Sequence, residues 1–135
     1  MSHVIALQGR AGSGKTSTLR QVISDLEAKY PNATVQVLAG RIDLKMIMHG
    51  VKGKIVGIET QGDPGSRLQQ SLKDFTAARC DIIFCACRTS GMTVQWVSAL
   101  SKKHNVQFVQ QTRVAAAYTK TNAIMAASLI KLAGL

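Results

Sequence analysis

The chain has 135 residues, of which 46% are hydrophobic, and this suits one domain with one core. No apolar run approaches the length of a membrane span, and the first residues lack a signal-peptide pattern, so we expect a cytoplasmic protein with no membrane partner. The odd number of cysteines argues against a disulfide framework, and we expect buried free thiols at Cys80, Cys85 and Cys87.

The charge balance is strongly basic. Seventeen Lys and Arg residues oppose seven Asp and Glu residues, which gives a net charge of +10. Such an excess favours polyanionic partners. The cations are scattered and aromatic residues are few, so nucleic-acid binding stays open without being the leading interpretation. Ordinary solubility together with a polyphosphate site explains the charge equally well.

The first chemical motif follows an apolar segment, residues 3–8, which predicts a buried strand. The next eight residues fit the pattern G-x-x-x-x-G-K-[ST], and residues 15–30 then predict a helix that Pro31 ends. Glycines let successive backbone N–H groups point at phosphates, and the helix N-terminus adds partial positive charge. We expect phosphate contacts from Gly9, Arg10, Ala11, Gly12, Ser13, Gly14, Lys15, Thr16 and Ser17.

Two side chains of this motif carry specific chemistry. Lys15 would give a full positive charge to the outer phosphates, and the hydroxyl of Thr16 is an oxygen ligand suited to Mg²⁺. The strand, loop and helix resemble the Walker A segment of the P-loop NTPases. This resemblance implies a three-layer α/β/α fold with a mostly parallel central sheet, and binding of ATP or another nucleoside triphosphate with Mg²⁺.

The segment after the first helix contains another candidate acid. Residues 33–39 predict a second strand, and Asp43 follows it. By resemblance to P-loop kinases, Asp43 could act on an acceptor hydroxyl and Arg41 could bind a substrate anion; a loop acid that caps a turn is the simpler interpretation. Residues 44–58 predict an antiparallel hairpin, with a short helix over 43–50 as the alternative.

The loop after this hairpin is the second place where we expect chemistry. Glu59 ends an apolar strand, where the resemblance implies a Walker B acid, and Asp63 is the competing acid. Either carboxylate could support Mg²⁺ or the attacking water, and Gln61 could position that water. The alternative is a polar turn. The glycines and Pro64 suggest that the loop over 59–67 changes with nucleotide state.

The remaining segments predict, in chain order, a helix over 66–79, a buried strand over 82–87, a helix over 94–103 capped by Thr93, a strand over 106–110 and a helix over 119–134. Arg88 follows the buried strand, so it is a candidate cation for the γ-phosphate or a second substrate; a solvated loop arginine is the alternative. The resemblance implies that Arg113 lies near the base or ribose.

Departures from known P-loop classes limit the functional interpretation. No N-K-x-D motif follows a late strand, so ATP is expected by elimination, and residues 88–107 have no room for the arginine-rich lid of a nucleotide kinase. The leading hypothesis is a small ATP hydrolase with Lys15, Glu59, Asp63 and Arg88 as catalytic candidates, slow unless a protein partner supplies an arginine. The alternatives are a kinase that uses Asp43 and a non-catalytic, nucleotide-dependent module that binds nucleic acid. The sequence does not indicate an oligomeric state.

Overall fold

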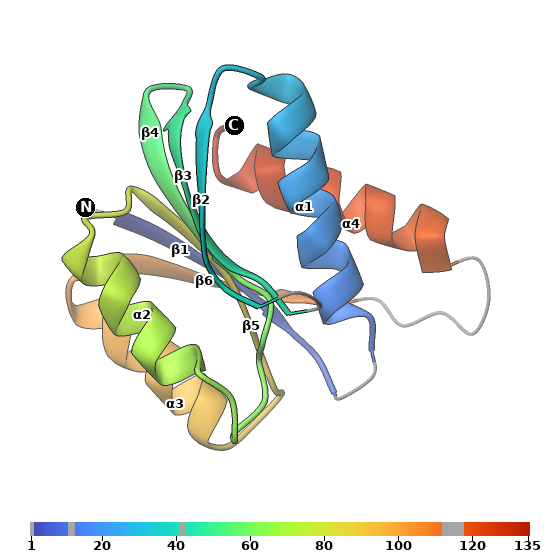
Figure 1. Ribbon diagram of the computed structural model, residues 1–135. Helices are drawn as coiled ribbons and strands as arrows, with labels where there is room; N and C mark the ends of the chain where they lie inside the picture. Colours follow the sequence, from blue (N-terminus) through green and yellow to red (C-terminus); the bar gives the residue numbers. More distant parts are fainter. Residues whose placement is uncertain (1, 11–12, 41–42, 112–117) are drawn as a thin grey trace.

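The computed structural model describes residues 2–10, 13–40, 43–111 and 118–135 (Figure 1). Within these ranges the strands are β1 (Ser2–Gln8), β2 (Thr34–Ala39), β3 (Lys45–Val51), β4 (Lys54–Glu59), β5 (Ile82–Cys87) and β6 (His104–Gln110). The helices are α1 (Lys15–Lys29), α2 (Leu68–Ala77), α3 (Met92–Ser98), the 3₁₀ helix η1 (Ala99–Lys102) and α4 (Tyr118–Leu132).

The six strands form one sheet in the order β2-β3-β4-β5-β1-β6. The pairs β4–β5, β5–β1 and β1–β6 are parallel, whereas β3 is antiparallel to both of its neighbours. The predicted α/β class with a mostly parallel sheet is therefore confirmed. The predicted hairpin is confirmed too, because β3 pairs with β4 with Ile47 opposite Gly57, and this excludes a helix over 43–50.

Helices cover both faces of the sheet, with α1 and α4 on one face and α2 and α3 on the other (Figure 1). Side chains alternate along β1, so Ile5 and Leu7 join the core beneath α1 and α4, while Val4 and Ala6 join the core beneath α2 and α3. Strand β5 is buried along its whole length because it is covered on both faces. The burial of β5 on both faces explains why residues 82–87 form a continuous apolar run in the sequence.

Glycine sets the distance between α2 and the sheet. A Cβ atom at Gly57 of β4 would lie 2.7 Å from the ring of Phe75, which is fully buried on α2. Since no side chain fits there, the ring packs directly on the strand backbone. This contact fixes how α2 approaches the end of β4, where the candidate acids lie.

The region after β5 departs from the predicted pattern. Helix α3 begins at Met92 with Gly91 as its N-cap, at φ 87°, so the prediction that Thr93 caps this helix is wrong. The Thr93 hydroxyl instead accepts a 2.9 Å hydrogen bond from the backbone N–H of Arg88 and so holds the turn after β5. All three cysteines are free and buried, as expected. Among the described helices, none combines the length and apolar character needed to cross a membrane.

Candidate functional site

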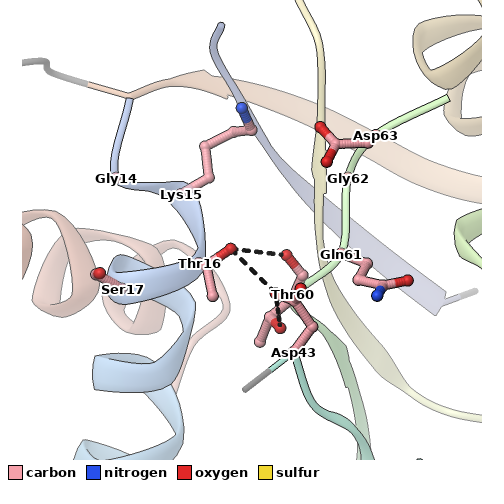
Figure 2. Close-up of a pocket in the computed structure, with 9 residues that line it drawn as sticks. All are labelled: Gly14, Lys15, Thr16, Ser17, Asp43, Thr60, Gln61, Gly62 and Asp63. Carbon is pink, nitrogen blue, oxygen red and sulfur yellow. Dashed lines mark hydrogen bonds between the residues drawn. The ribbon is translucent and has the colours of Figure 1, made fainter. Parts of the chain in front are cut away.

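A polar pocket of about 360 Å³ lies at the carboxyl end of β1 (Figure 2). Three segments build it: the start of α1, the turn before β3 and the loop after β4. Its lining residues are Gly14, Lys15, Thr16, Ser17, Asp43, Thr60, Gln61, Gly62 and Asp63. Parallel strands bring their carboxyl ends to one edge of a sheet, which is where ligands gather in open α/β folds.

The side chain of Lys15 folds back onto the two residues that follow β1. The Nζ atom of Lys15 donates hydrogen bonds of 2.7 Å to the carbonyl oxygens of Gly9 and Arg10. Gly14 has a φ of 95° just before α1, and a Cβ atom at Gly9 would lie 2.6 Å from Oγ of Ser13. The left-handed conformation at position 14 therefore favours glycine, and a side chain at position 9 would require Ser13 to move. Ala11 and Gly12, also predicted to contact phosphate, lie outside the described residues.

The environment of Lys15 opposes its positive charge. Burial lowers the pKa of Lys15, and the nearby Arg88 lowers it as well, while Asp63 and Cys87 raise it. Burial is the largest of these effects. A partly desolvated ammonium at the start of a helix gains more from a bound anion than an exposed one does, because its charge is poorly screened.

Ser13 provides a further test of whether an anion fits. Its residue is only 8% exposed, and its Oγ atom is buried without a hydrogen-bond partner among the described residues. Leaving such a hydroxyl unpaired costs about 1–3 kcal/mol. Ser13 directly precedes the lining residues Gly14 to Ser17 without lining the pocket itself, so a phosphate oxygen would accept its hydrogen bond only if the side chain turned toward the pocket.

Two oxygen-bearing side chains meet on the other side of the pocket. The Thr16 hydroxyl lies 3.3 Å from Oδ1 of Asp43 and 3.4 Å from the carbonyl oxygen of Thr60 (Figure 2). Oδ1 of Asp43 also accepts a 3.2 Å hydrogen bond from the Thr60 hydroxyl, which in turn accepts one of 2.8 Å from the backbone N–H of Leu44. The role of Thr60 was missed from the sequence.

These oxygens form a donor set suited to Mg²⁺, which commonly takes one or two carboxylates and completes its shell with water and phosphate oxygens. Among the described residues, no group of three or more His, Cys, Asp or Glu side chains could hold a metal ion by itself. The fit therefore depends on Thr16 and Asp43 acting together with a bound polyphosphate.

Glu59, the predicted Walker B acid, does not line the pocket. Side chains alternate along β4, and this residue faces α2, where it is completely buried. Its Oε1 atom accepts hydrogen bonds from Nε of Arg67 at 2.7 Å and from the Ser71 hydroxyl at 2.6 Å. The carboxylate is thus already neutralised by an ion pair.

Arg67 joins this ion pair to the pocket. Its Nη2 atom donates to the carbonyl oxygen of Asp43 at 2.6 Å, and its backbone N–H donates to Oε1 of Gln61 at 3.3 Å. The guanidinium of Arg67 therefore links Glu59 to the turn that carries Asp43, and its backbone N–H ties the start of α2 to Gln61. Sequence reasoning missed Arg67 and Ser71, although a cation eight residues after a buried acid was a usable signal.

Asp63 and Arg88, both predicted site residues, form an ion pair at the rim, with Nη2 of Arg88 2.9 Å from Oδ1 of Asp63. Asp63 lines the pocket and its side chain is 64% exposed. Gly62 makes this approach possible, because a Cβ atom there would lie 2.7 Å from the backbone of Ala86 on β5.

Four predicted site residues remain to be placed. Ser17 lines the pocket, and Arg10 is exposed and contributes its carbonyl oxygen to Lys15. Arg41 and Arg113 lie outside the described residues. The site therefore brings together the start of α1, Asp43 and Asp63, while Glu59 lies behind it.

Fold and site together define an α/β domain with a mostly parallel sheet and a polar pocket at the carboxyl ends of its strands. Comparison with known proteins found no matching family model, no matching curated protein and no matching solved structure. The function is therefore inferred from the residues of the pocket.

Proposed function

We propose that the chain has the P-loop NTPase fold and binds and hydrolyses a nucleoside triphosphate, with ATP as the expected nucleotide and Mg²⁺ as the metal. The observation that carries this proposal is the loop before α1. There the ammonium group of Lys15 donates hydrogen bonds to two carbonyl oxygens, and the buried hydroxyl of Ser13 has no hydrogen-bond partner among the described residues. A buried cation and an orphan donor at a helix N-terminus are what a polyphosphate requires.

Residues of the chain would share the binding of the phosphates. The N–H of Thr18 bonds to the carbonyl oxygen of Gly14, and the N–H groups that precede it in the first turn of α1 have no acceptor within the helix. We expect these N–H groups and the Ser13 hydroxyl to bind phosphate oxygens. Lys15 would exchange a loop carbonyl for an outer phosphate, which recovers the electrostatic cost of its burial.

Thr16 and Asp43 would hold Mg²⁺, directly or through water, because the Thr16 hydroxyl and Oδ1 of Asp43 lie 3.3 Å apart in the pocket. The ion would supply positive charge to the phosphate oxygens as the γ-phosphoryl group transfers to water. Asp63 lines the same pocket and could orient the water. Glu59 would act indirectly, by fixing Arg67 and through it the carbonyl of Asp43.

A kinase is the second candidate, and the exposure of Asp43 to the pocket favours it. In that case the carboxylate would accept the proton of an acceptor hydroxyl rather than support the metal. Hydrolysis and transfer differ in one measurable respect, the need for an acceptor. A module that binds nucleotide without turnover is the third candidate.

The test is phosphate release from Mg²⁺-ATP by the full chain, compared with Lys15→Ala and with Lys54→Ala. Lys54 is exposed at the far end of β4 and serves as the matched control. We expect a slow turnover, roughly 10⁻⁴ to 10⁻² s⁻¹ without a partner, that Lys15→Ala abolishes and Lys54→Ala keeps. Turnover only with an added acceptor would support the kinase, and equal rates in both variants would contradict the proposal.

A further inference from the structure

A second hollow lies on the face of the sheet covered by α2 and α3. Its volume is about 430 Å³, and it is formed by the end of α2, by η1 and by the first residue of β6. That residue, His104, pairs with Ser2 at the start of β1. The hollow therefore lies at the amino ends of these strands, opposite the edge that carries the phosphate loop.

The hollow continues along the seam between the helices. A smaller one of about 220 Å³ shares Lys73, Ala99 and Leu100 with it and is lined by Trp96. We call the two together the α2–α3 groove. Ala77, Ala99 and Leu100 give the larger part an apolar lining, and Leu100 is half-buried against the core. A concave, mostly apolar site of this size matches those that take small ligands.

The charge around the groove has one sign. Lys73, Lys102 and Lys103 line it and are exposed, and no Asp or Glu is among its lining residues. None of the three ammonium groups forms an ion pair with another described residue. Lys45, by contrast, is paired with Asp74 of α2. The rim of the groove is thus positive and uncompensated, which complements an anionic group.

His104 lies at the same end as these lysines. Both of its ring nitrogens are buried and have no hydrogen-bond partner in the described part of the chain. An imidazole carries at least one N–H donor in either protonation state. An acceptor entering the groove at this end would pair with a ring N–H that has no partner among the described residues, once the ring turns toward it.

We propose that the α2–α3 groove binds a small anionic amphiphile, such as a medium-chain carboxylate. Its apolar body would lie between α2 and Leu100, and its anionic head would lie near Lys102 and Lys103. A partner helix is a poorer fit, because a stable interface needs roughly 800 Å² from each side, and α2 with its ten residues is only about 15 Å long. This site is independent of the nucleotide pocket.

The chain contains a reporter for this binding, since Trp96 is its only tryptophan. Decanoate is titrated into the full chain while tryptophan fluorescence is recorded. Decyltrimethylammonium, with the same chain length and the opposite charge, and an acidic amphipathic peptide form the other arms. We expect a saturable change with decanoate and binding at least tenfold weaker with the cation. Equal binding of both amphiphiles, or tighter binding of the peptide, would overturn the proposal.

Variants locate the binding. The double variant Lys102→Gln/Lys103→Gln should weaken decanoate about three- to tenfold, as expected for exposed charge pairs. The control Lys54→Gln/Lys120→Gln removes two exposed lysines elsewhere and should leave the affinity unchanged. Ala99→Phe fills both hollows from an exposed position and should abolish binding. Equal weakening by both double variants, or unchanged binding in a folded Ala99→Phe variant, would contradict the assignment.

Discussion

The hydroxyl of Thr16 lies 3.3 Å from Oδ1 of Asp43, although 27 positions separate the two residues in the chain. The contact joins the first turn of α1 to the turn before β3 across the pocket. It makes Asp43, rather than Glu59, the carboxylate in contact with the hydroxyl that the phosphate-loop motif assigns to Mg²⁺.

Asp43→Asn should weaken the Mg²⁺-dependent part of nucleotide binding while the fold is kept. The substitution removes a negative charge beside Thr16 but preserves an oxygen for the hydrogen bonds from Thr16 and Thr60. We expect a loss of about tenfold in affinity with Mg²⁺ and little change with EDTA, on the scale of one charge-assisted interaction. Calorimetric titration with a non-hydrolysable ATP analogue measures both. A loss of equal size in EDTA would count against the metal role.

Glu59→Gln should act on stability instead. It removes the charge that neutralises Arg67 behind the pocket. Breaking a fully buried ion pair costs about 3–5 kcal/mol, and we expect roughly 2–3 kcal/mol here because Arg67 is 26% exposed. The free energy of unfolding, measured in urea for the wild type and the variant, tests this value. If the variant kept wild-type stability but lost Mg²⁺ dependence, Glu59 and not Asp43 would be the metal acid.

Gly62→Ala should disturb the loop that carries Asp63. The added Cβ atom would lie 2.7 Å from backbone and side-chain atoms of Ala86, so the loop must move away from β5. We expect a destabilisation of about 1–3 kcal/mol and weaker nucleotide binding. Gly65→Ala, three residues on, meets nothing within 4 Å and is the control. Similar urea midpoints for the two variants would mean that the close approach to β5 is unimportant.

Ser13→Ala should separate binding from stability. The Ser13 hydroxyl is buried without a partner among the described residues, so its removal should leave the free protein as stable as before or more stable. Nucleotide affinity should fall about two- to tenfold, the value of one hydrogen bond to a charged acceptor. Thermal unfolding with and without nucleotide tests both statements. A less stable variant with unchanged affinity would show that the hydroxyl serves the fold.

The buried thiols should make stability fall at high pH. Burial raises the pKa of Cys87 to about 11, although Lys15 lowers it, and burial raises the pKa of Cys80 to about 12. Above pH 9 the unfolded chain loses these protons while the folded chain keeps them, so the free energy of unfolding decreases as pH rises. We expect a slope of roughly 1 kcal/mol per pH unit for each thiol, and a shallower slope in Cys87→Ala. Equal slopes in the wild type and in Cys87→Ala would contradict a raised pKa at Cys87.

Local patterns account for the parts of the fold that the sequence predicts well. Strand β1, the loop and α1 follow from an apolar run, three glycines and helical spacing within about 30 residues. The order of the strands rests on pairings between distant segments, such as β1 with β5 and with β6, for which one sequence holds no direct signal. The position of β2 at the edge of the sheet, next to β3, also has no direct signal in the sequence.

The sequence leaves the choice between the candidate acids open for a related reason. Alternation predicts that Glu59 and Thr60 point to opposite sides, but which side holds the pocket depends on where α2 packs. Helix α2 covers Glu59 and supplies Ser71, and Arg67 precedes it. The pair of Asp63 with Arg88 likewise depends on β4 and β5 being neighbours, which the sequence does not encode in any local pattern.

The most direct test of the proposed phosphate binding by the loop before α1 is thermal unfolding of the wild type and of Lys15→Ala with a non-hydrolysable ATP analogue and Mg²⁺. At a ligand concentration of about 100 Kd, we expect the wild-type midpoint to rise by roughly 10 °C. The variant should unfold near the wild-type midpoint without nucleotide and show no rise with it. An equal rise in both proteins would contradict the account.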